Sequence, residues 1–416
     1  MPSDDGGRSE LNGGFSGFDS GLLSPGTVGA DLAVSDTAVL RALVDAEVGY
    51  LRALAEVGIA PESAAEALAG VGVVSELGDL AQRATDGGNP VIPLIADLRS
   101  AVSAVDPASV DWIHRGATSQ DIVDTAVMLV AHRARTEVLG LLDQSIQSLA
   151  GLAEQHRNTL AAARTLTQHS TPTTWGLRFA NWLTSLLDAR ETLAAIPLQA
   201  QLGGASGTLA SLVEIAGPEV AGSVPAAFAR SLGLSAPSAP WHISRSSVTR
   251  LGDALVGVTD VYGTIASNVA TLTRTEIAEV AEPTSTGRGT SSAMPQKRNP
   301  VYSVLLRSLS LRAPALASTL HVAAASFVDE RPDGAWHAEW PALRELLRIT
   351  LGGAALLEGL TAGLTVDVDR AAKNLALTGD DILAERKKLS GSSGKPADYV
   401  GLSDAFIDTA IARVRS

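Results

Sequence analysis

A loop rich in small residues carries the groups of this chain that could do chemistry. The stretch from Gly287 to Pro300 reads GRGTSSAMPQKRNP and separates two long segments of helical character. The Lys297 ammonium and the Asn299 amide could hold a carboxylate and stabilise an anion formed beside it, and Ser291 contributes a hydroxyl group. Composition alone, however, favours an ordinary interhelical linker, because most Gly/Ser loops have no chemical role.

Two other stretches combine hydroxyl, amide and imidazole groups. The first, from His114 to Ala126, reads HRGATSQDIVDTA. Thr118 or Ser119 is expected to cap the helix that follows, and the free N–H groups of such a helix start also bind carboxylates. The second, from Ala163 to Thr174, reads ARTLTQHSTPTT and contains His169. A lone His is more often a hydrogen-bonding residue than a catalyst, which leaves both roles open.

The order Ser-Ser-x-Met-Pro-x-Lys-x-Asn-Pro resembles the signature of the fumarase/aspartase superfamily, which includes adenylosuccinate and argininosuccinate lyases and bacterial 3-carboxy-cis,cis-muconate cycloisomerases. The other two stretches resemble the first and second conserved regions of that superfamily. The resemblance implies that Ser291 is the general base, acting as an alkoxide, and that Lys297 and Asn299 hold the substrate carboxylate. Removing a proton beside a carboxylate leaves a dianionic aci-carboxylate, which needs preorganised positive charge. Thr290 is a departure, since the family usually has Gly there.

The second region departs from the superfamily at one chemically important place. Adenylosuccinate and argininosuccinate lyases carry His directly after the Arg-Thr pair and use it in acid or charge-relay chemistry. This chain has Leu166 at that place and a His only at His169. Expelling a nitrogen leaving group needs a proton donor, whereas a carboxylate leaving as a stable anion does not. Leu166 therefore favours lactone chemistry over C–N cleavage.

Three weaker matches, Gln201 to Ala210, Pro240 to Arg245 and Gly334 to Trp340, also resemble the cycloisomerase branch. Each alone is compatible with helix packing, a turn or core filling. The resemblance covers about residues 20 to 385. It implies interconversion of 3-carboxy-cis,cis-muconate and γ-carboxymuconolactone, in the protocatechuate branch of the β-ketoadipate pathway. An adenylosuccinate lyase-like enzyme and a non-catalytic relative, like the lens crystallins recruited from this superfamily, remain as alternatives.

The resemblance also implies how the substrate is held and how the protein assembles. The catalytic set would be Ser291, Lys297 and His169. The tricarboxylate would be gripped by side chains of which Arg245 is favoured, because a guanidinium binds a carboxylate bidentately. The full set of substrate-binding candidates is His114, Thr118, Ser119, Gln168, Arg245 and Asn299. We expect no metal and no nucleotide cofactor, and a homotetramer whose active sites are shared between subunits.

The elements that must position these groups are predicted to be helices. Aromatic residues make up only 4% of the chain and period-2 alternation is scarce, so strand signals are poor. Asp36 or Ser35 is expected to cap a helix that ends near Gly58. Ser119 to Gln155 has no Pro and is apolar almost all round, as in a helix inside a bundle. Val248 to Glu282 also lacks Pro and would span about 50 Å as one helix.

We therefore predict an all-α protein with the three-domain fumarase/aspartase-like fold and a central bundle of long helices. The predicted parts are a disordered tail (1–20), an N-terminal helical domain (21–107), the central bundle (108–364) and a small, shortened C-terminal helical domain (365–416). In the last part, Lys387 to Pro396 is expected to be a loop and Ala405 to Val414 a short amphipathic helix.

Composition excludes several classes of protein. The 416 residues contain no Cys, which excludes disulfides, thiolate nucleophiles and Cys-ligated zinc. The net charge of −13 argues against a nucleic-acid partner and requires Lys and Arg to be concentrated locally if the substrate is anionic. Apolar stretches are interrupted before about 18 residues and the start lacks the pattern of a signal peptide, so we expect a cytoplasmic protein without a membrane span.

Overall fold

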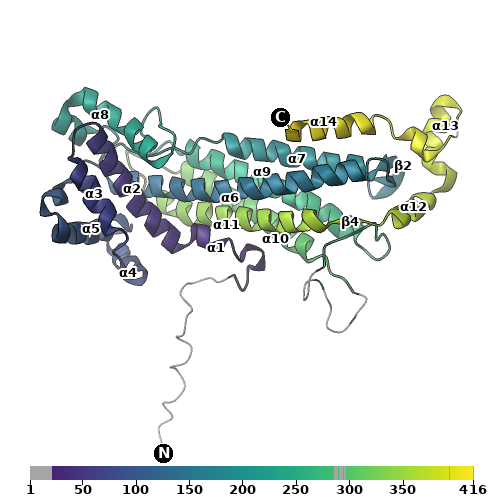
Figure 1. Cartoon of the computed structure of the whole chain (residues 1–416), viewed down its shortest axis with the longest axis horizontal. Helices are drawn as coiled ribbons and strands as arrows, with labels where there is room; N and C mark the ends of the chain where they lie inside the picture. The colour runs from purple at the N-terminus through teal and green to yellow at the C-terminus, as the bar shows by residue number, and fades with distance from the viewer. Residues whose placement is uncertain (1–20, 285–288, 290–293, 295–296, 393, 416) are drawn as a thin grey trace, which may run out of the picture.

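The computed structural model describes residues 21–284, 289, 294, 297–392 and 394–415; the predicted tail (1–20) lies outside them. The molecule is elongated, with long helices side by side along its length (Figure 1). The N-terminal helices lie at one end, and the β1–β2 hairpin lies at the other with the segment that follows β4. The all-α architecture with a central bundle of long helices predicted from the sequence is confirmed.

The N-terminal end begins as the capping residues predict. The Ser35 hydroxyl accepts a hydrogen bond from the Ala38 N–H at 3.2 Å, and this cap starts the helix whose apolar face is buried. The elements of this end are η1 (Pro25–Thr27), α1 (Asp31–Val34), α2 (Asp36–Glu56), α3 (Glu62–Val71), α4 (Leu77–Gly87), α5 (Val91–Val105) and η2 (Pro107–Trp112).

Five long helices form the body: α6 (Ser119–Gln155), α7 (Trp175–Ala195), α9 (Ser246–Leu272), α10 (Val301–Ala324) and α11 (Gly334–Gly363), whereas α8 (Ala210–Leu232) packs against α2 at the N-terminal end (Figure 1). The packed pairs among them include α9 with α10, α10 with α11, and α6 with both α7 and α11, and together they enclose the main apolar core. Helix α6 begins and ends where the sequence predicts. Its 37 residues span about 55 Å at 1.5 Å per residue.

The predicted continuous helix from Val248 to Glu282 was wrong at its end. Helix α9 stops at Leu272, and Ala278 then adopts a left-handed conformation with φ 49°. The buried Glu279 carboxylate that follows accepts hydrogen bonds from Arg164 and Asn374, which turns the chain away from the helix axis. The next two residues form β3 (Val280–Ala281), paired antiparallel with β4 (Thr365–Val366).

A second pair of strands, β1 (Leu160–Thr165) and β2 (Gln168–Thr174), was also not anticipated. The strands are antiparallel and are joined by Leu166 and Thr167, whose φ angles are 47° and 71°. Residues other than Gly seldom adopt this left-handed conformation, so the turn carries no sequence signal of a hairpin.

The C-terminal segment contains α12 (Val368–Ala376), η3 (Gly379–Leu383), α13 (Ala384–Ser390), η4 (Pro396–Tyr399) and α14 (Ser403–Arg415). The predicted loop from Lys387 to Pro396 was partly wrong, because its first residues belong to α13, which ends at the left-handed Gly391. The predicted amphipathic helix is present as α14. It returns along α7, where Arg413 pairs with Asp188 at 2.7 Å.

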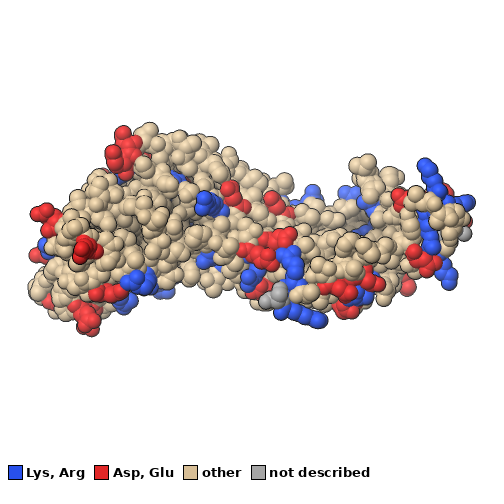
Figure 2. All heavy atoms as spheres, turned by 90° about the horizontal axis from the view of Figure 1, so that it is seen from above, with Lys and Arg blue, Asp and Glu red and all other residues tan. Residues whose placement is uncertain are grey.

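Basic and acidic side chains alternate over the face seen in Figure 2, so this face carries no broad basic surface. Within the described residues one helix, α11, is long and apolar enough to cross a membrane by length and composition. However, 67% of its apolar window is buried inside the protein, as in the core helix of a bundle.

Candidate active site

The ends of the signature loop are anchored by a carboxylate and a close backbone contact. Glu282 accepts hydrogen bonds from the N–H groups of Tyr302 and Ser303, both at 2.9 Å, and so caps α10. The Asn299 N–H donates to the Gly289 carbonyl at 2.9 Å. A Cβ on Gly289 would lie 2.7 Å from the Asn299 carbonyl oxygen, so only Gly fits there.

The structure describes the predicted carboxylate-binding residues of the loop but not the predicted base. Ser291 and Thr290 lie outside the described residues. Lys297 is exposed and Asn299 is half-buried. Neither side chain makes a hydrogen bond or ion pair with any described residue, so both remain available to hold a carboxylate.

The start of α6 is organised by one buried carboxylate. Asp121 accepts from the N–H groups of Thr118 at 3.0 Å, Gly203 at 2.8 Å and Gly204 at 3.0 Å, and it lies 2.7 Å from His242 Nε2. Thr118 is therefore the N-cap residue, as one of the two sequence interpretations had it. Asp121 holds the Gly-rich loop against this helix start, a role that its place three residues after the cap could have suggested.

His114 lies at the same end of the molecule. Its Nδ1 is 2.6 Å from the Oε1 of Glu47, a carboxylate in α2 that is only 1% exposed. Burial lowers the pKa of His114, but the negative charges of Glu47 and Asp121 outweigh burial and raise the pKa overall. Glu47 was not among the residues predicted from the sequence. The sequence pattern that could have pointed to Glu47 is a lone acidic residue on the apolar face of a predicted helix.

The β1–β2 hairpin holds Gln168 and His169 at the opposite end. The Gln168 side chain is exposed, and the Leu166 side chain at the tip is 96% exposed. His169 Nδ1 lies 2.7 Å from the Thr378 hydroxyl oxygen. Burial, and then the positive charge of Arg164, lower the pKa of His169, so its imidazole is neutral at pH 7.

Beneath the hairpin, two guanidinium groups share one buried carboxylate. Glu279 pairs with Arg164, and its other oxygen lies 3.8 Å from Arg178. Burial lowers the pKa of Arg178 to about 10, and its guanidinium lies 4.4 Å from the centre of the Trp175 ring. Because Glu279 directly precedes β3, this cluster joins the hairpin to the segment that leads into the signature loop.

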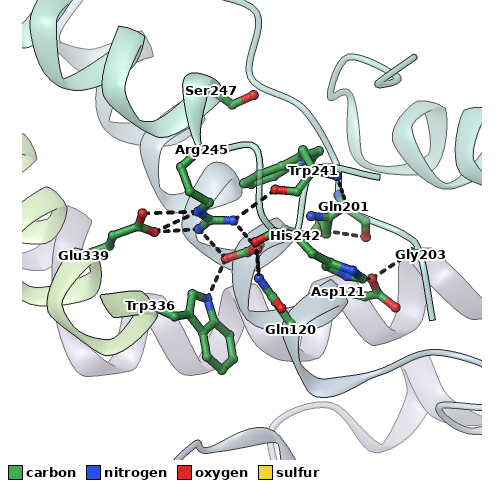
Figure 3. A network of polar contacts seen from close by, with 12 residues as sticks. Gln120, Asp121, Gln201, Gly203, Trp241, His242, Arg245, Ser247, Trp336 and Glu339 are labelled. Carbon is green, nitrogen blue, oxygen red and sulfur yellow. Dashed lines mark hydrogen bonds and ion pairs between the residues drawn. The ribbon is translucent and has the colours of Figure 1, made fainter. Parts of the chain in front are cut away.

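Arg245 does not occupy the position expected of a residue that grips a substrate. It is 4% exposed, and its guanidinium faces the Glu339 carboxylate (Figure 3) and also pairs with the Asp124 carboxylate. The closest contacts are 2.7 Å to Asp124 and 2.6 Å to Glu339, and Trp336 Nε1 donates to Asp124 at 2.9 Å. Since its three guanidinium nitrogens all donate to these carboxylates, we revise Arg245 from a substrate-binding residue to an interior ion-pair residue.

Replacing Arg245 with Met is expected to lower the free energy of unfolding by about 3–5 kcal/mol, because two buried carboxylates lose their counter-charge. Urea unfolding monitored by tryptophan fluorescence would measure the loss. The matched control is Arg230→Met, which breaks an exposed pair with Glu56 and should cost less than about 1 kcal/mol. Equal losses in the two variants would contradict the interior role of Arg245.

Comparisons with known proteins confirm the predicted fumarase/aspartase-like fold. A family model described as lyase matches residues 34–314. The protein is a member of the lyase family. The chain is 45% identical to a nitrosuccinate lyase from Streptomyces davaonensis, over 88% of this chain and 79% of the relative. It is 41% identical to a 3-carboxy-cis,cis-muconate cycloisomerase from Pseudomonas aeruginosa, over 84% of this chain and 76% of the relative. A solved 3-carboxy-cis,cis-muconate lactonizing enzyme from Pseudomonas putida superposes with a TM-score of 0.87 at 30% identity, covering 95% of this chain and 99% of that one.

Two groups of the candidate site residues lie far apart within one chain. His114, Thr118 and Ser119 lie at or just before the start of α6, and the hairpin with Gln168 and His169 follows its far end (Figure 1). Because α6 is straight enough to span about 55 Å, the two groups of one chain do not meet.

Proposed function

We propose that this lyase removes a proton beside a substrate carboxylate and expels, from the neighbouring carbon, a leaving group that departs as a stable anion. Ser291 accepts the proton as the base. The electron pair of the C–H bond forms the new C=C bond, and the pair of the broken bond leaves with the anion. Lys297 and Asn299 hold the carboxylate whose negative charge grows during proton removal.

The observation that carries this proposal is the hairpin tip. Leu166, which cannot donate a proton, stands where C–N lyases of the superfamily carry His, and its side chain is 96% exposed. The nearby His169 has a lowered pKa and is neutral at pH 7, so it is a hydrogen-bonding group there and not a strong acid. A leaving group that is stable as an anion needs no proton donor.

Two substrates meet this requirement. Nitrosuccinate is the first, because nitrite is a stable anion and a relative named for this substrate is 45% identical to the chain. Loss of nitrite would leave fumarate. The second is γ-carboxymuconolactone, whose ring carboxylate leaves to give 3-carboxy-cis,cis-muconate. The TM-score of 0.87 to a lactonizing enzyme supports this second reaction.

We further propose that the lyase is a homotetramer in which the start of α6 from one subunit meets the hairpin and signature loop of others. The separation of the two groups along α6 supports this arrangement, since no single chain brings them together. Each substrate carboxylate would then meet side chains from more than one subunit.

Three parallel assays test the proposed reaction. Purified protein is incubated separately with each of three substrates. With nitrosuccinate, the nitrite released is measured colorimetrically, and with 3-carboxy-cis,cis-muconate, the loss of diene absorbance is measured. The third substrate is adenylosuccinate. We expect turnover of one of the first two and none of the third. Cleavage of adenylosuccinate would overturn the requirement for a leaving group that is stable as an anion. No turnover of any of the three substrates would favour the non-catalytic alternative.

A further inference from the structure

Glu47 is a charged residue on a buried helical face. It belongs to α2, it is 1% exposed, and the side chains around it on this helix, Leu43, Val44 and Leu51, are buried and apolar. One carboxylate oxygen lies 2.6 Å from His114 Nδ1, and the other has no hydrogen-bond partner among the described residues. Burying a carboxylate is costly unless a positive charge compensates it, so this contact requires an explanation.

The backbone around His114 is fixed from two helices. His114 itself has a left-handed φ of 61°. The Tyr50 hydroxyl of α2 donates to the carbonyl of Arg115 at 2.7 Å, and Arg99 of α5 donates to the carbonyl of Ile113 at 2.9 Å. These bonds anchor the residues on both sides of His114 and hold its ring against Glu47.

The orientation of the ring follows from the Glu47 contact. With Nδ1 donating to Glu47, Nε2 lies on the opposite edge of the imidazole, and no described residue bonds to it. The His114 side chain is 17% exposed. One N–H group of a charged ring is therefore left for a ligand at the end of the molecule where α6 begins.

The charged groups facing the ring favour its protonated form. Glu47 from α2 and Asp121 from α6 raise the pKa of His114, whereas burial and Arg99 from α5 lower it. The two carboxylates outweigh the opposing effects, and the pKa is raised overall. These charges favour the imidazolium form of His114 beside the buried Glu47 side chain.

We propose that Glu47 is a positioning residue that keeps His114 as an imidazolium and aims its Nε2–H at a substrate carboxylate beside the start of α6. This inference rests on the proposed function for the anionic nature of the ligand. It explains why an acidic residue lies on a helical face that is otherwise apolar. It also identifies one of the positive charges that an acidic protein needs to bind an anion.

The test is a histidine NMR titration of the free protein, with the His114 resonance assigned through His114→Asn, followed by a titration with succinate as the probe. In the wild type we expect a pKa above the ordinary 6.5. Glu47→Gln is expected to lower this pKa by about one unit, which at pH 6.5 reduces the protonated fraction of His114, and with it succinate binding, by up to about fivefold. Glu47→Asp, which keeps the charge, should retain most of both properties.

The matched control is Tyr50→Phe, which removes a hydrogen bond from the same turn and leaves both charges in place. A merely structural role of Glu47 predicts that Tyr50→Phe and Glu47→Gln alter succinate binding alike, with no selective change in the pKa. A wild-type pKa at or below 6.5, or an unchanged pKa in Glu47→Gln, would overturn the inference even if one variant folds poorly. The titration needs no turnover, so inactivity on every substrate would count against the proposed function alone.

Discussion

Replacing Ser291 with alanine is expected to lower kcat on the order of 10⁴-fold while substrate binding changes little. The reason is that the proposed base accepts the proton only during the reaction, whereas Lys297 and Asn299 hold the carboxylate in the ground state as well. Steady-state kinetics on the substrate found active would give kcat, and calorimetry would give the dissociation constant of the same substrate with the inactive variant.

The neighbouring Ser292 supplies the matched control for this experiment. Ser292→Ala removes an identical hydroxyl from the next residue of the same loop, so it changes the loop's composition equally. We expect it to retain activity within about tenfold of the wild type. A large loss in Ser292→Ala with near-normal Ser291→Ala would assign the base to Ser292. Near-normal activity in both variants would refute a serine base in this loop.

Local signals in the sequence predicted the long helices well. The bounds of α6 were right because its start carries Thr118 as N-cap, its interior has no Pro, and its apolar residues extend all round. The N-cap of α2 is Ser35, one of the two residues predicted for it from the sequence. Such signals act within a few residues of one another, so the sequence displays them directly.

The features that the sequence did not predict depend on contacts between distant segments. A sequence does not distinguish an Arg that binds a substrate from one that pairs inside the protein, and Arg245 meets Asp124 from 121 residues away. The turn at Leu166 and Thr167 uses two residues that rarely adopt left-handed conformations. The role of Glu47 can be inferred only from the fold, which places its carboxylate against His114.

Mixing two inactive variants tests whether the active sites are shared. His114→Ala removes a group at the start of α6, and Ser291→Ala removes the base from the signature loop. If one site takes these groups from different subunits, subunits exchanged at random should restore up to about a quarter of the wild-type activity. The measurement is activity after co-denaturation and refolding of equal amounts of the two proteins, relative to each variant treated alone.

The control pairs Ser291→Ala with Lys297→Ala, whose lesions lie in the same loop. Every loop in that mixture carries one lesion, so no exchange of subunits creates an intact loop, and activity should stay at the level of the single variants. Restoration by the first pair and not by the second requires that α6 and the loop meet across a subunit boundary. A fully active monomer, or a first pair that stays inactive although the subunits have exchanged, would instead require one chain to bring the start of α6 and its own signature loop together.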